Sequence, residues 1–127
     1  ATDHAPHTEQ EKSNGLLNSP FGIVGLETAF PLLYTHFVKN NTFTLQQLVD
    51  WITIKPSQIF NLPYGTMKVG SVADLVLVDL DQQQTIDSSE FASKGRNTPF
   101  NQWNVQGIPT MTLVEGKIIW RKEEAHV

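Results

Sequence analysis

Apolar side chains in the first half of the chain recur at helical spacing. They stand three and four positions apart between residues 25 and 39, which predicts a helix with one apolar face. The residues expected on that face are Leu26, Phe30, Leu33 and Phe37. Pro31 lies inside the pattern, so the helix is expected either to begin late, with the proline in its first turn, or to kink there.

A second helix is marked by its own start signal. Thr44, with Gln47 three residues later, forms a capping box, in which each side chain satisfies a backbone amide at the start of the helix. The apolar stripe expected to be buried consists of Leu45, Leu48, Val49 and Ile52. Pro56 suits the first turn of a third, short helix that ends near Phe60.

The second half of the chain has the pattern of strands. Residues 72–80 are apolar and β-branched, which predicts a buried strand. Two further strand patterns, over residues 108–114 and 117–121, flank Glu115 and Gly116, a pair suited to a two-residue hairpin turn. Helices are therefore expected first in the chain, and strands after them.

Size and composition are those of an ordinary globular domain. The chain has 127 residues, of which 39% are hydrophobic and 17% charged, and this is enough apolar material for a core. Two regions are expected within it, residues 1–64 with the helices and residues 65–127 with the strands. The first residue is Ala1, and because a dense motif follows at once, we expect the chain to be part of a longer protein.

Charge and cysteine content argue against several classes of function. The formal net charge is -4 and no basic patch is visible, so a nucleic-acid partner is not expected. The absence of cysteine excludes disulfides, thiolate zinc sites and cysteine nucleophiles, and it is compatible with a reducing cytoplasm. The most apolar stretch, residues 21–38, is interrupted by Glu27 and His36, so it is not expected to span a membrane.

The first candidate for chemistry is the pair formed by Asp3 and His7. They lie four residues apart in a segment stiffened by Pro6, so both side chains can point into one cleft. A carboxylate can bind a cation and carry protons, and an imidazole can bind a metal or hold an anionic substrate. In the alternative interpretation, Asp3 caps a turn and His7 is a surface histidine. His4 is expected only to support the loop.

A second candidate lies at residues 19–22, after a polar run over residues 8–14 that is expected to be a loop. Gly22 allows a ligand to approach the backbone closely, and exposed amide groups there could bind a carbonyl or a carboxylate. In the alternative interpretation, this segment is only a loop-to-helix turn, with Phe21 packed in the core.

A polar and aromatic loop precedes the last strands. Asn97 is a candidate to close a turn in it, and Phe100 and Trp103 are expected to be packing residues. His36 and His126 are not expected to take part in chemistry, since one falls in a helical pattern and the other near the end of the chain.

Taken together, these segments resemble the bacterial dihydroorotase family, within the amidohydrolase superfamily. They occur in family order and cover almost the whole chain. The first two are the most specific to dihydroorotases, whereas the one that begins at Gly70 is shared across the superfamily. The matching segments are residues 1–7 (ATDHAPH), 19–29 (SPFGIVGLETA), 53–56 (TIKP), 70–76 (GSVADLV), 97–100 (NTPF) and 114–117 (VEGK).

The resemblance implies an α/β fold: the C-terminal part of a (β/α)₈ TIM barrel, plus strands of a small composite β-sandwich. It makes Asp3 a metal ligand and the group that carries a proton from the metal-bound water to the leaving nitrogen. His7 would bind a substrate carboxylate, and the backbone at Phe21 and Gly22 would contact the pyrimidine ring. The implied cofactor is zinc, binuclear in the full-length enzyme.

The implied reaction is the reversible hydrolysis of dihydroorotate to N-carbamoyl-L-aspartate in pyrimidine biosynthesis. The resemblance also implies a cytoplasmic enzyme with a small-molecule substrate, a homo-oligomeric state and an association with aspartate transcarbamoylase. The other metal ligands of the family have no counterpart in this chain. A catalytic zinc needs about three protein ligands, so the chain alone is expected to be inactive and to bind zinc weakly.

Three other interpretations stay open. The first is another cyclic amidohydrolase, such as a hydantoinase or an allantoinase, which shares the barrel and the aspartate. The second is a catalytically dead homologue that serves as a structural partner. The third is a free-standing α+β binding module, which would explain the length of the chain but not its ordered set of motifs.

Overall fold

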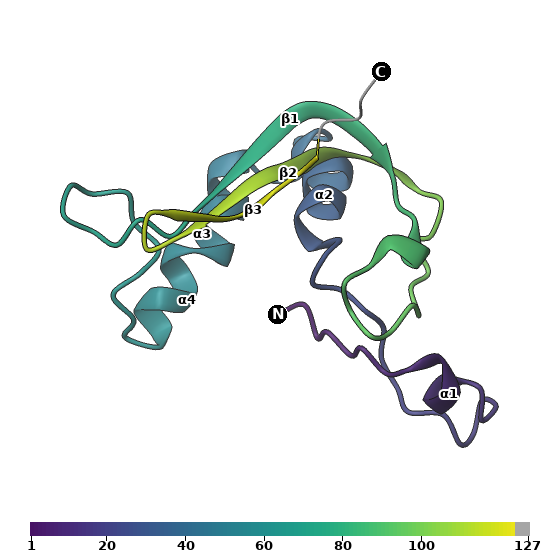
Figure 1. Cartoon of the computed structure of the whole chain (residues 1–127). Coiled ribbons are helices and arrows are strands. Elements are labelled where there is room, and N and C mark those ends of the chain that lie inside the picture. Colours follow the sequence, from purple (N-terminus) through teal and green to yellow (C-terminus); the bar gives the residue numbers. More distant parts are fainter. Residues whose placement is uncertain (124–127) are drawn as a thin grey trace.

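The computed structural model describes residues 1–123, which form short helices followed by a three-stranded antiparallel sheet in the order β1-β2-β3. Figure 1 shows the sheet arching over α2, with α3 and α4 toward one end of the molecule and α1 at the other. The expected order of helices before strands is confirmed. The elements are α1 (Glu9–Lys12), α2 (Ala29–Leu33), the π-helical segment η1 (Tyr34–Val38), α3 (Leu45–Ile52), α4 (Ile54–Ile59), β1 (Leu75–Thr85), the 3-10 turn η2 (Ser88–Glu90), β2 (Asn104–Val114) and β3 (Lys117–Arg121).

Local start signals predict the helices well. The capping box of α3 is confirmed: the Gln47 amide donates to Thr44 Oγ1 at 3.1 Å, and the Thr44 amide donates to Gln47 Oε1 at 2.8 Å. The third helix, α4, contains Pro56 in its first turn, as predicted. Across residues 1–123, no helix combines the length and the apolar character needed to cross a bilayer.

The expectation of a loop over residues 8–14 is wrong, because α1 lies within this run. Thr8 and Glu11 form a second capping box, in which the Thr8 amide donates to Glu11 Oε2 at 2.7 Å. The spacing of threonine and glutamate is itself a helix-start signal. The polar character of the run hid it, since a helix that buries nothing has no apolar stripe.

The helix expected over residues 25–39 begins late, with Pro31 in the first turn of α2, which was one of the two predicted outcomes. Its second half, η1, is π-helical, which the pattern did not predict. The expected apolar face is only partly covered, because the side chain of Leu26 is 64% exposed and that of Phe37 is 42% exposed.

The predicted burial is wrong at two further places. In α3, Leu48 is buried but Ile52 is 49% exposed. The strand expected over residues 72–80 begins at Leu75 and is not buried, since Val76 and Leu77 are about half exposed. Periodicity marks which side chains are apolar, but burial also requires a neighbouring layer, and within the described residues these faces have none.

The hairpin turn at Glu115 and Gly116 is confirmed. Both residues adopt left-handed φ angles, of 50° and 76°, as a two-residue turn matched to the twist of its strands requires. The adjoining β2 begins at Asn104, earlier than predicted, and pairs with β1 across two irregularities in register. In one of them, Asp79 Oδ1 accepts hydrogen bonds from two following amides of its own strand.

The core lies between the sheet and the segments around α2. The partly buried side chains of Leu32 and Phe100 pack against it. Helix and sheet meet closely at Gly107, where a Cβ atom would lie 2.8 Å from Tyr34 Cδ1. The buried residues of the core are Val24, Ile86, Phe91, Val105 and Ile108. His126 lies outside the described residues, and the division into residues 1–64 and 65–127 stays a prediction.

Candidate active site

Asp3 stands near the start of the chain in an uncommon backbone conformation. Its φ is 49°, in the left-handed region, which costs a non-glycine residue roughly 1–3 kcal/mol and is best tolerated by aspartate and asparagine. The side chain is exposed, and within residues 1–123 its carboxylate accepts no hydrogen bond. The carboxylate is therefore not used to cap a turn, and it is available to a ligand.

Residues after Asp3 pair with the segment that holds Gly22. His4 and Ile23 form an isolated parallel bridge, and the Ala5 amide donates to the Ile23 carbonyl at 2.8 Å. The His7 amide then donates back to the Ala5 carbonyl at 2.9 Å, which turns the chain. Two segments about 20 residues apart in sequence are thus held side by side.

The His4 side chain strengthens this pairing. Its Nδ1 atom accepts hydrogen bonds from the amides of Gly25 at 3.1 Å and Leu26 at 3.2 Å. A nitrogen that accepts two hydrogen bonds carries no proton, so the ring proton is assigned to Nε2. The expectation that His4 supports the loop is confirmed.

Gly22 packs against Ala5 so closely that no side chain fits. Its φ is 99°, and a Cβ atom would lie 2.5 Å from Ala5 Cβ. Its carbonyl accepts hydrogen bonds from Lys12 Nζ at 2.8 Å and Asn97 Nδ2 at 2.7 Å, and Lys12 Nζ also donates to the Pro20 carbonyl. The Gly22 amide donates no hydrogen bond in the described part of the chain. Of its two polar groups, only the N–H is left for a ligand.

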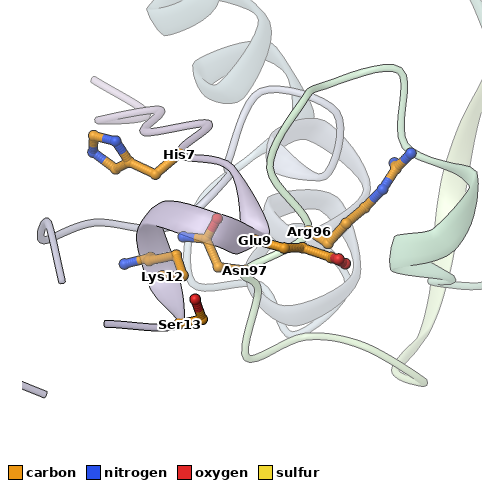
Figure 2. Close-up of a pocket in the computed structure, with 6 residues that line it drawn as sticks. All are labelled: His7, Glu9, Lys12, Ser13, Arg96 and Asn97. Atoms are coloured by element: carbon orange, nitrogen blue, oxygen red, sulfur yellow. The ribbon is translucent and has the colours of Figure 1, made fainter. Parts of the chain in front are cut away.

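His7 lines a cavity of about 310 Å³ beside this segment, together with side chains from α1 and from the loop before β2. Figure 2 shows that the Arg96 side chain points away from His7. The guanidinium of Arg96 is held by the Phe91 carbonyl, to which Nη1 donates. Lys12 is the other cationic residue of the lining, its Nζ donates to the Pro20 and Gly22 carbonyls, and Glu9 adds a carboxylate. The lining residues are His7, Glu9, Lys12, Ser13, Arg96 and Asn97.

Glu27 ties the loop before β2 to the start of the helical region. Its carboxylate accepts hydrogen bonds from the amides of Ala92 at 2.9 Å and Ser93 at 3.1 Å, and from Ser93 Oγ at 2.6 Å. Partial burial acts to raise the pKa of Glu27, but the hydrogen bonds from Ser93 and Ala92 and the charge of Arg96 outweigh it, so the pKa lies below its usual value.

The structure brings the four candidate positions together only in part. His7 and Gly22 lie near each other, since Lys12 and Asn97 contact Gly22 and line the cavity with His7. Asp3 belongs to no metal-binding cluster, because residues 1–123 hold no group of three or more histidine, aspartate or glutamate side chains that could bind a metal ion. The side chain of Phe21 is 93% exposed, so the alternative in which it packs in the core is wrong.

Three residues of this arrangement were not predicted from the sequence pattern. Asn97 was expected to close a turn, but its side chain braces Gly22, 75 residues earlier in the chain. Glu27 and Lys12 gave no signal at all, because their partners are distant in sequence or are backbone carbonyls of a loop. Both aromatic residues of the loop do pack: Trp103 meets the rings of Phe100 and His36 edge to face.

Comparison with known proteins decides the family. The sequence model of the amidohydrolase family matches residues 1–119. The chain belongs to the amidohydrolase family. It is 66% identical over 123 residues to the dihydroorotase of Shouchella clausii and 61% identical over 125 residues to that of Geobacillus thermodenitrificans. These matches cover 97% and 98% of the chain, which spans about 29% of the length of each relative.

Solved amidohydrolases share the fold of this segment. The L-hydantoinase of Arthrobacter aurescens is 36% identical, with a TM-score of 0.77, over 87% of the chain and 25% of that protein. The D-hydantoinase of a Thermus species is 30% identical, with a TM-score of 0.85, over 95% of the chain and 28% of that protein. The short helices and the sheet are thus arranged as in these larger enzymes.

Proposed function

We propose that this chain is the C-terminal portion of a dihydroorotase, which hydrolyses the cyclic amide of dihydroorotate reversibly to N-carbamoyl-L-aspartate. The observation that carries the proposal is the identity of 56–66% to proteins named dihydroorotase, over nearly the whole chain. The two solved hydantoinases are only 36% and 30% identical, which favours dihydroorotase over a hydantoinase. The full-length polypeptide that contains this chain is called the complete enzyme.

We further propose that residues 1–64 belong to the C-terminal part of a (β/α)₈ barrel and residues 65–127 to a composite β-sandwich. The exposed apolar faces support this, because they need a covering layer that a barrel and a second sheet would supply. Every residue of β3 is exposed, as expected for an edge strand with a free side.

In this proposal Asp3 is a metal ligand and the proton carrier. Its carboxylate is exposed and takes part in no internal hydrogen bond within residues 1–123, so both oxygens are free for these tasks. The left-handed φ supports the same role, since strained backbone is kept where a side chain must be aimed. A carboxylate in this position can accept a proton from water and release it to a leaving nitrogen, as a reversible reaction requires.

His7 and Gly22 are proposed to hold the substrate. The His7 side chain lines the cavity, and an imidazole N–H can donate a hydrogen bond to a substrate carboxylate. The Gly22 carbonyl is already occupied, so the contact proposed for Phe21 and Gly22 is made by the peptide between them, with the Gly22 N–H as donor to a ring carbonyl. Only a glycine allows this approach, because a side chain would meet Ala5.

The proposed cofactor is zinc, and its fit to the chain is partial. A free carboxylate oxygen is a suitable zinc ligand, and Asp3 supplies one. Residues 1–123 hold no group of three or more such ligands, so the complete enzyme would have to provide the rest of the site. When bound, zinc lowers the pKa of a coordinated water and polarises the amide carbonyl.

A cytoplasmic location, a homo-oligomeric state and an association with aspartate transcarbamoylase complete the proposal. The transcarbamoylase as partner is implied by the family resemblance alone.

Substrate hydrolysis tests the proposal. The complete enzyme is expected to prefer dihydroorotate over hydantoin and allantoin. Asp3→Asn is expected to lower kcat by about 10³-fold or more, since asparagine tolerates the same left-handed φ but cannot carry the proton. A preference for hydantoin or allantoin would instead assign the chain to another cyclic amidohydrolase. No turnover of any of the three substrates would support a catalytically dead homologue.

A further inference from the structure

The loop before β2 contacts both halves of the candidate site, the segment that carries His7 and the segment that carries Gly22. Gly95 is buried, and a Cβ atom there would lie 2.7 Å from the His7 carbonyl oxygen and 2.9 Å from the Pro6 carbonyl carbon. No side chain fits between these segments. The backbone at Gly95 is therefore pressed against the segment that carries His7.

Two residues later, Asn97 contacts the other half of the site twice. Its side chain donates from Nδ2 to the Gly22 carbonyl at 2.7 Å, and its own carbonyl accepts from the Val24 amide at 3.0 Å. These two hydrogen bonds hold the chain on either side of Ile23. Asn97 thus acts as a clamp on the segment that contains the Gly22 peptide.

The orientation of the Asn97 amide follows from its surroundings. If the amide were reversed, its oxygen would face the Gly22 oxygen at 2.7 Å, and two acceptors would repel each other. In the observed orientation Oδ1 is buried and has no hydrogen-bond partner among the described residues. Leaving a buried oxygen unpaired is unfavourable, and the amide accepts this in order to donate from Nδ2 to the Gly22 carbonyl. This indicates that the donor is needed there.

A clamp is needed here because Gly22 is a glycine. Glycine has the widest choice of backbone conformations, so a free glycine would not keep its N–H in one direction. The peptide that follows Gly22 is planar, so holding its carbonyl oxygen fixes that peptide and the ψ rotation at Gly22. The Gly22 N–H belongs to the preceding peptide, and the chain before that peptide is held where Lys12 Nζ donates to the Pro20 carbonyl at 2.7 Å. Lys12 supplies a second donor to the same carbonyl, but from a flexible side chain on a short helix.

Resting on the proposed function, we propose that Asn97 is a positioning residue of the dihydroorotase reaction. It does not touch the substrate. By holding the Gly22 carbonyl, it limits rotation at Gly22. The Pro20 carbonyl is held by Lys12, so the peptide between Phe21 and Gly22 is kept with the Gly22 N–H facing the pyrimidine ring. Gly95 packs against the segment of His7 and Asn97 binds the Gly22 carbonyl, so the same loop holds both substrate-binding segments in place.

Steady-state kinetics of the complete enzyme test this role. Asn97→Ala and Asn97→Asp are expected to lower kcat/KM for dihydroorotate by about 10–100-fold, mainly through KM. The aspartate variant should be the worse of the two, because it places a second acceptor against the Gly22 carbonyl. Asn101→Ala is the matched control. Asn101 lies in the same loop, and within residues 1–123 its side chain accepts a hydrogen bond from the Ser88 amide alone, so a change within about twofold is expected.

Equal losses in the Asn97 and Asn101 variants, or an Asn97→Ala enzyme with unchanged KM and a lower melting temperature alone, would overturn the positioning role.

Amide hydrogen exchange gives a readout without turnover. Asn97→Ala is expected to speed exchange at Val24 and Ala5 by about tenfold, and Asn101→Ala to leave both unchanged; equal exchange in the two variants refutes the clamp. Absence of dihydroorotate turnover in the unmodified enzyme refutes the proposed function, and the exchange comparison still decides whether Asn97 holds this segment.

Discussion

Replacing Gly22 by alanine tests the tight packing on which the candidate site depends. Two separate costs are expected. The first comes from the backbone, because a φ of 99° is unfavourable for any residue with a side chain. The second comes from space, because the new Cβ would lie 2.5 Å from Ala5 Cβ, a separation that the two segments can relieve only by moving apart.

The magnitude follows from these two costs. A left-handed conformation destabilises a non-glycine residue by about 1–2 kcal/mol. Forcing an extra methyl into a packed contact adds about 1–3 kcal/mol. Gly22→Ala should therefore destabilise the folded state by about 2–5 kcal/mol. Gly15→Ala isolates the first cost at about 1–2 kcal/mol, because Gly15 has a φ of 77° and no atom within 4 Å of the added Cβ.

A double-mutant cycle with Ala5→Gly separates the two costs further. Removing Ala5 Cβ leaves only the Ala5 Cα, at an ordinary 3.9 Å, so the effect of Gly22→Ala should fall to about 1–2 kcal/mol in that background. Urea unfolding of the complete enzyme measures the free energies, and kcat/KM for dihydroorotate should recover in parallel. If Gly22→Ala costs no more than Gly15→Ala, or if Ala5→Gly brings no relief, the close contact does not exist.

Three further outcomes are expected. Thr44→Ala should destabilise the fold by about 1 kcal/mol through loss of the α3 capping box. Thr42→Ala removes no side-chain hydrogen bond within residues 1–123 and should be neutral in urea unfolding. The pKa of Glu27 is lowered in the folded state, so its stabilising effect is present above its unfolded pKa and lost as the pH falls; the melting-temperature difference between wild type and Glu27→Gln should shrink below about pH 4.5. The 127-residue chain alone should show no dihydroorotate turnover with added zinc, and turnover near that of the complete enzyme would contradict the single-ligand interpretation of Asp3.

Features that depend on a few neighbouring residues were predictable. The capping box at Thr44 and the turn at Glu115 and Gly116 appear as expected, because each is satisfied by atoms within three or four residues. The late start at Pro31 belongs to the same class, since proline acts on the turn in which it stands. The helix that begins after Thr8 was missed although its capping signal is present in the sequence.

Features that depend on a distant partner were not predictable. The spacing of Leu26, Phe37 and Ile52 marks them as apolar, but their exposure depends on whether another layer covers them. Asn97 looked like a turn residue, and only the fold brings it to the Gly22 carbonyl. The Glu27 carboxylate accepts a hydrogen bond from Ser93 Oγ, 66 positions later in the sequence, and no local pattern encodes such a separation.

The sequence by itself determined where α3 and α4 begin and where the hairpin turns, since these features follow from short-range sterics and from residue type. Tertiary structure alone decided that the Gly22 carbonyl is occupied, because its donors come from α1 and from the loop before β2. Hydrogen bonds between distant segments form only when packing has brought them within about 3 Å, and that distance is a property of the fold.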